Sequence, residues 1–168
     1  MAALAAAGIY GVKRLRTTDV ARPGVFVPAA MASALAALPD GGLLYGEQRT
    51  GRVFEVSADG TSRKLVAELD VATNGDRGLM GLTVDPSGAH RYASWVAPDG
   101  RFAVGELTPG GAVVTWIGPL TGERENGGRI AWSPRGLVFA AGAQGAVASR
   151  EDQASPLGKL LYVPAVPV

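Results

Sequence analysis

The chain has 168 residues, the size of one domain, and its 16 basic and 15 acidic residues give a formal net charge of +1. This near balance, with no basic face, argues against a nucleic-acid partner. The absence of cysteine excludes disulfides and thiol catalysis, and the single histidine, His90, excludes any site built from two imidazoles. The 24 glycines and 11 prolines are typical of a chain made of many short strands and turns.

Residues 1–28 are predicted to form an N-terminal segment, separate from a domain that spans residues 29–168. The apolar run Met1–Val12 is too short to span a membrane. The basic residues that follow it stand on the wrong side of the run for a secretory signal. The segment is therefore either a helix with a basic C-terminal end, which we favour, or the remnant of a longer export signal.

Short strands begin with the first repeat of the domain. Ala29–Leu38 is rich in alanine and would suit a helix, but it leads directly into the Pro39-Asp40-Gly41 turn, so we predict an innermost strand. Gly42–Tyr45 and Val53–Val56 are predicted to form a hairpin, with Leu65–Ala67 as the outer strand.

The same plan recurs twice. A glycine-rich loop over residues 74–81 enters a strand at Leu82–Val84, which is followed by a hairpin of residues 95–107 and an outer strand at Ala112–Ile117. The third repeat has strands at Ile130–Trp132 and Leu137–Ala141, and residues 157–163 are predicted to add another.

Three prolines mark equivalent turns in these repeats. Pro39, Pro86 and Pro134 lie 47 and 48 residues apart. A unit of about 40–50 residues made of short strands is typical of a propeller blade. We predict an all-β fold, an incomplete β-propeller of three to four blades, and the alternative is a β-sandwich in which turns recur. Because a propeller must close, its open blade edges predict a homodimer or a missing second half.

Four segments resemble, in order, the soluble quinoprotein glucose dehydrogenases and their glucose/sorbosone dehydrogenase relatives. These segments are residues 38–53, 75–86, 125–130 and 157–161, and they correspond to the N-terminal half of the family's six-bladed ring. The resemblance implies PQQ-dependent oxidation of an aldose sugar, pyrroloquinoline quinone (PQQ) and calcium as cofactors, and a periplasmic or secreted location. The family's cofactor-clamping basic residues and calcium ligands lie in its second half, so the alternative is that this chain holds neither cofactor.

The resemblance also gives the candidate site. Glu125 stands at the position of the family's catalytic histidine, and Arg124 stands where an acid orients that histidine. Because a carboxylate beside an arginine is a poor general base, we expect the chain to be catalytically incomplete. A non-catalytic propeller module that binds a protein partner is the alternative function, and a truncated gene product is a third interpretation.

Further residues are candidates for binding substrate or cofactor, and none is a candidate metal ligand. They are Asp76, Arg77, Asn126, Arg129 and Gln144. For each of these residues the alternative to a binding role is a structural role, either in a corner of the chain or in a solvated loop. We favour the structural role.

Other polar and aromatic residues are expected to be structural. His90 follows a turn and should lie at the surface. Four aspartates in Pro/Gly turns should cap backbone amides rather than bind metal. They are Asp40, Asp59, Asp85 and Asp99. Trp95, Trp116, Trp132 and Phe139 should fill the space between blades.

Overall fold

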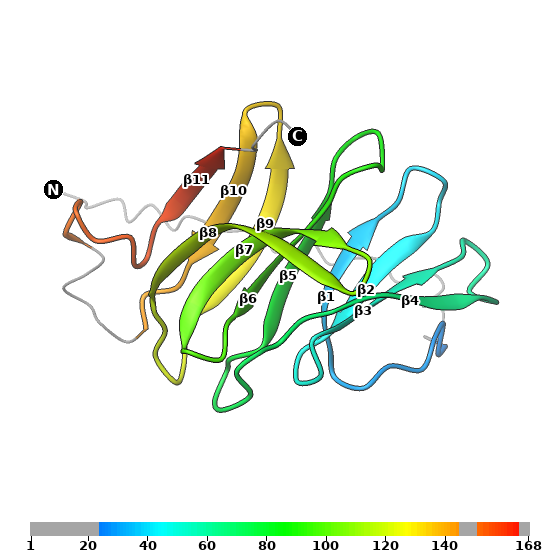
Figure 1. Cartoon of the computed structure of the whole chain (residues 1–168), viewed down its shortest axis with the longest axis horizontal. Coiled ribbons are helices and arrows are strands. Elements are labelled where there is room, and N and C mark those ends of the chain that lie inside the picture. The colour runs from blue at the N-terminus through cyan, green and yellow to red at the C-terminus, as the bar shows by residue number, and fades with distance from the viewer. Residues whose placement is uncertain (1–23, 145–150, 165–168) are drawn as a thin grey trace, which may run out of the picture.

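The computed structural model describes residues 24–144 and 151–164, whose strands form three antiparallel sheets (Figure 1). The first sheet contains β1 (Ala32–Ala37), β2 (Leu43–Glu47), β3 (Arg52–Val56) and β4 (Arg63–Glu68), in chain order. The second contains β5 (Leu79–Val84), β6 (Arg91–Val96), β7 (Arg101–Thr108) and β8 (Gly111–Leu120), again in order. The third contains β9 (Gly127–Ser133), β10 (Gly136–Ala141) and β11 (Leu160–Pro164). Residues 1–23 of the predicted N-terminal segment lie outside the described residues.

The turns that join the first two strands of each sheet are built by short polar side chains, as the sequence predicts. After β1, the Asp40 carboxylate accepts the amide of Gly42 at 2.9 Å, and Gly41 takes a left-handed φ of 87°. After β5, the Asp85 carboxylate accepts the amides of Ser87 and His90. In such a turn the carboxylate accepts a hydrogen bond from the backbone amide two residues later. This bond replaces one that a paired strand would make, and it stabilises the reversal of the chain.

Two hydrophobic cores fill the space between neighbouring sheets. The first lies between the first and second sheets and includes Leu44, Val53, Leu79 and Trp95. The second lies between the second and third sheets and includes Phe102, Leu137 and Phe139. Trp116 and Trp132 are partly buried against this second core. The predicted inter-blade role of these aromatic residues is therefore confirmed.

The innermost strands of the three sheets lie side by side. β1 contacts β5, and β5 contacts β9, so the sheets radiate from a common centre, with the second sheet between the other two (Figure 1). No described sheet closes on itself, and the first and third sheets stand at the two ends of the row. The prediction of an all-β, incomplete propeller is confirmed, and three sheets are described.

The last strand begins later than the sequence predicts. β11 starts at Leu160 rather than at residue 157, because Gly158 takes a left-handed φ of 70° and donates its amide to the Gly142 carbonyl at 3.2 Å. Within the described residues, no helix is long and apolar enough to cross a membrane.

Candidate functional site

The Arg129 side chain joins the three innermost strands. Its guanidinium extends from β9 and donates to the carbonyls of Met80 on β5, at 2.6 Å, and Ser33 on β1, at 3.4 Å. Ser33 in turn donates its hydroxyl to the Leu79 carbonyl at 2.7 Å. Hydrogen bonds to a charged group are stronger than neutral ones, so Arg129 fixes the spacing of these strands.

The glycine-rich loop before β5 and the loop before β9 are joined by two hydrogen bonds from backbone amides. The amide of Asp76 donates to the Glu123 carbonyl at 2.8 Å. The amide of Glu125 donates to the Asp76 carboxylate at 3.3 Å. This pairing brings two segments about fifty residues apart to one corner, where Asp76 and Glu125 are both exposed.

Two residues at this corner have an unusual backbone conformation. Glu125 and Gln144 have φ angles of 55° and 54°, in the left-handed region that residues with a side chain rarely occupy. The amide of Gln144 donates to the Glu125 carbonyl at 3.3 Å, so the two conformations support each other. Among the described residues, Met31 is the third residue of this kind. Such strain gathers at functional sites, which makes the corner a candidate site.

Asn126 is buried in this corner, with only 1% of its surface exposed. Its side-chain amide donates to the Gly122 carbonyl at 3.0 Å, and its own carbonyl accepts the amide of Gly142 at 2.7 Å. Its side-chain oxygen finds no partner among the described residues. The residue holds the loops before β9 and after β10 together.

The Arg77 side chain contacts Thr121 rather than the corner around Glu125. Its guanidinium donates to both the hydroxyl and the carbonyl of Thr121, at 2.9 and 2.8 Å. Its own carbonyl accepts the side-chain amide of Gln48 at 3.1 Å. These contacts explain Arg77 as a link between the glycine-rich loop and the end of the second sheet, and a binding role for it stays a prediction.

A depression of about 390 Å³ opens beside these residues. Four of the predicted site residues line it together, namely Asp76, Glu125, Asn126 and Arg129. A second hollow of about 340 Å³ lies against Arg129 and includes residues of β1 and β5. The charged lining of the first depression consists of two carboxylates and one guanidinium. Arg77 and Gln144 are not part of this lining.

Sequence reasoning missed two polar residues that also line the depression, Ser33 and Gln48. Gln48 lies within residues 38–53, one of the segments that carry the family resemblance, so the resemblance could have identified it as a candidate site residue. Ser33 stands in an alanine-rich stretch with no distinguishing pattern, and only its position on an innermost strand brings it to the site.

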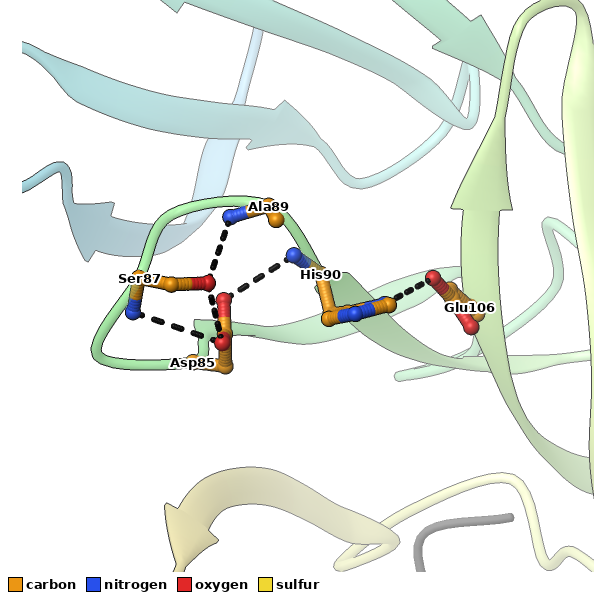
Figure 2. A network of polar contacts seen from close by, with 5 residues as sticks. All are labelled: Asp85, Ser87, Ala89, His90 and Glu106. Carbon is orange, nitrogen blue, oxygen red and sulfur yellow. Dashed lines mark hydrogen bonds and ion pairs between the residues drawn. The ribbon is translucent and has the colours of Figure 1, made fainter. Parts of the chain in front are cut away.

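The turn aspartates have the structural role that was predicted for them. Asp59 accepts the amide of Thr61 and Asp99 accepts that of Arg101, both at 3.0 Å. Figure 2 shows the Asp85 turn, in which the amide of His90 donates to Asp85 while its ring reaches Glu106 on β7 at 2.7 Å. No group of three or more histidine and acidic side chains suited to a metal occurs in the described part of the chain.

The structure is similar to several solved sugar dehydrogenases. One is the PQQ-bound aldose sugar dehydrogenase of Streptomyces coelicolor, at 26% identity and a TM-score of 0.70, over 80% of this chain and 45% of that one. Another is an oxidoreductase of Thermus thermophilus described as a glucose dehydrogenase, at 32% identity and a TM-score of 0.68, over 80% and 44%. A third glucose dehydrogenase, at 24% identity and a TM-score of 0.68, shares the fold.

The chain spans less than half the length of each of these solved structures. No family model matches the sequence, and no curated protein matches it. The resemblance predicted from the sequence is confirmed by the solved structures, and its extent agrees with an N-terminal half.

Proposed function

We propose that this chain is a sugar-binding part of a propeller of the PQQ-dependent sugar dehydrogenase type, and that it does not oxidise a sugar by itself. The observation that supports the proposal is the depression beside the innermost strands. Its lining includes Asp76, Glu125, Asn126 and Arg129, which the resemblance to these dehydrogenases selects from the sequence.

The lining suits the hydroxyl groups of a monosaccharide. Each sugar hydroxyl can donate one hydrogen bond and accept others, and carboxylates accept while amides and guanidinium groups donate. Asp76 and Glu125 supply acceptors to the lining, and Gln48 adds an amide whose nitrogen also donates to the Arg77 carbonyl. A small number of convergent polar groups in a concave site is the usual arrangement for a small ligand.

The described residues of this chain do not form a suitable PQQ site by themselves. This quinone carries several carboxylates, and it requires nearby positive charge. The depression offers two carboxylates against a single guanidinium, and that guanidinium already donates to the carbonyls of Met80 and Ser33. Like charges repel each other, so the two carboxylates of this lining would oppose an anionic cofactor.

The proposed lack of activity also rests on position 125. A general base must lie within hydrogen-bond reach of the sugar hydroxyl and must match the working pH. Position 125 carries a glutamate where the resemblance places an imidazole. The backbone of Glu125 is held by Asp76 and Gln144, so its side chain begins from a fixed point at the rim of the depression.

Two measurements test the two halves of this proposal. The first is turnover of D-glucose and other aldoses with added PQQ, calcium and an artificial electron acceptor, for which we expect no activity. The second is saturation-transfer NMR with D-glucose, in which we expect a signal that Asp76→Ala weakens. The control variant is Asp70→Ala, an exposed aspartate that does not line the depression. Turnover would refute the lack of activity, and absence of saturation transfer would refute sugar binding. Equal transfer in both variants would refute binding at this depression.

A further inference from the structure

Exposed apolar side chains lie on the first and third sheets, at the two ends of the row, and a further group lies on β8 of the second sheet. On the first sheet, Leu35, Tyr45, Phe54 and Leu65 are paired across β1 to β4 and share the face that points away from the second sheet. Leu35 is 68% exposed and Leu65 is 46% exposed. On the third sheet, Leu160 and Tyr162 are 75% and 52% exposed.

The face of the third sheet that carries Leu160 and Tyr162 is mostly apolar, although the row that contains Leu160 ends at Arg129 on β9. Tyr162 pairs with Val138, and Val138 pairs with Ala131. Leu160 pairs with Ala140 in the adjacent row. Because side chains alternate between faces along a strand, these residues point away from the second core, which takes Leu137, Phe139 and Val163. None of the described residues of another sheet packs on this face.

The corresponding face of the first sheet is partly covered and forms an aromatic layer. The rings of Tyr45 and Phe54 are stacked at 5.1 Å, and the guanidinium of Arg63 lies 4.7 Å from the Phe54 ring centre. Arg63 also donates to the Tyr45 hydroxyl and to the Pro28 carbonyl. The segment before β1 thus lies on this face, and it adds the exposed side chain of Phe26, which lies beside Gly60, to the apolar surface.

The described part of the chain contains three sheets, and each segment outside it is shorter than one further four-stranded unit. Each four-stranded unit takes about 47 residues, whereas the segments outside the description are residues 1–23, 145–150 and 165–168. Propellers close with about four to eight sheets, so three are too few and six are within the range. A two-fold axis is the commonest symmetry of soluble oligomers, and it would set each exposed face against the other one.

We propose that two copies of this chain close into one ring of six sheets. In this ring the outer face of the third sheet of one copy packs on the outer face of the first sheet of the other, and the contact occurs twice. Leu160 and Tyr162 of one copy then lie against the row of Leu35 to Leu65 in the second. This inference is independent of the proposed function, since it requires neither sugar nor cofactor.

Mass measurement by light scattering on the full chain is the first test. We expect twice the 17.2 kDa of one chain at micromolar concentration. Leu35→Glu and Leu160→Glu should each give the single-chain mass, because a charge would be buried in both copies of the contact. The matched control is Val113→Glu, at a position that is 60% exposed on β8 and outside the contact, and it should keep the double mass.

A mixing experiment separates this ring from other dimers. Leu35→Glu chains keep the third-sheet face and Leu160→Glu chains keep the first-sheet face, so their mixture can form one intact contact and should partly regain the double mass. Circular dichroism checks that each variant folds. A single-chain mass for the unmodified protein, a mass that grows beyond two chains, or dissociation by Val113→Glu alone would each overturn the proposal.

Discussion

His90 is the only imidazole of the chain, and a carboxylate on a neighbouring strand sets its pKa. The hydrogen bond to Glu106 raises the pKa of His90 above 6.5, partial dehydration opposes this, and the charges of Glu106 and Asp85 add to the increase (Figure 2). The stabilisation from the charged ring is therefore complete below pH 6.5 and is lost as the pH rises through the raised pKa.

We expect Glu106→Gln to lower the pKa of His90 toward its ordinary value, because the amide removes the negative charge and keeps the shape. NMR titration of the imidazole measures this directly, since a single histidine gives a single set of ring signals. The control is Glu123→Gln, which changes an exposed carboxylate in the loop before β9. An unchanged pKa in Glu106→Gln would show that the contact does not form in solution.

Asp59 is a second residue whose ionisation is tied to the fold. Hydrogen bonds from the Ser57 hydroxyl and from the amide and hydroxyl of Thr61 lower its pKa from 3.8 to about 2. A lowered pKa contributes stability above pH 3.8, and that contribution is lost as the pH falls through about 2. Asp59→Asn should thus melt at a lower temperature than the unmodified protein at pH 7, and the difference should shrink as the pH approaches 2. A difference that is constant with pH would contradict this account.

At the scale of the strands, β5 and β9 approach so closely that one position tolerates only glycine. A Cβ atom on Gly81 would lie 2.6 Å from the Gly128 carbonyl oxygen and 2.7 Å from the Ser94 hydroxyl. The Ser94 hydroxyl itself donates to that carbonyl. The contact is therefore between backbone atoms of two innermost strands, which cannot move aside independently.

We expect Gly81→Ala to lower the free energy of unfolding by about 1–3 kcal/mol, the usual effect of overpacking. Gly111→Ala on β8 is the matched control, because a Cβ there meets nothing within 4 Å and its backbone needs no left-handed φ. Urea unfolding of the two variants measures the comparison. Equal stability of both variants would mean that β5 and β9 lie further apart than described.

The strands were predictable from the sequence because each turn carries its own local chemistry. Pro39, Pro86 and Pro134 mark the reversals of the chain. β1 is a strand despite its alanine content, because the turn that follows it pairs it with β2. The start of β11 was predicted wrongly, since the amide bond from Gly158 to Gly142 joins positions that no local pattern connects.

The candidate site was predictable only in part. The family resemblance gave Asp76, Glu125 and Asn126, which do lie together. The partner of Arg77 is 44 residues away, and the partners of Arg129 are 49 and 96 residues away. Such contacts depend on how the sheets are arranged around the centre, and this arrangement is not encoded in any short stretch.

At the scale of the whole molecule, the proposed ring predicts a melting temperature that depends on protein concentration. Association stabilises the folded state by mass action, so the melting temperature should rise as the protein is concentrated. Differential scanning calorimetry over a hundredfold range of concentration measures this. Leu160→Glu should remove the dependence, and a melting temperature independent of concentration in the unmodified chain would contradict the association.

The position of the second sheet in both hydrophobic cores means that the protein need not open all at once. The first and third sheets each pack mainly against this middle sheet, so either one can detach while the remaining interface persists. In a single chain that is not associated, amide hydrogens of β9 to β11 should then exchange with deuterium ahead of those of β5 to β7, which are released only when both interfaces are lost, whereas in the proposed ring every sheet has two neighbours. Within one chain, the loss of an end sheet would accordingly leave the interface between the other two sheets intact.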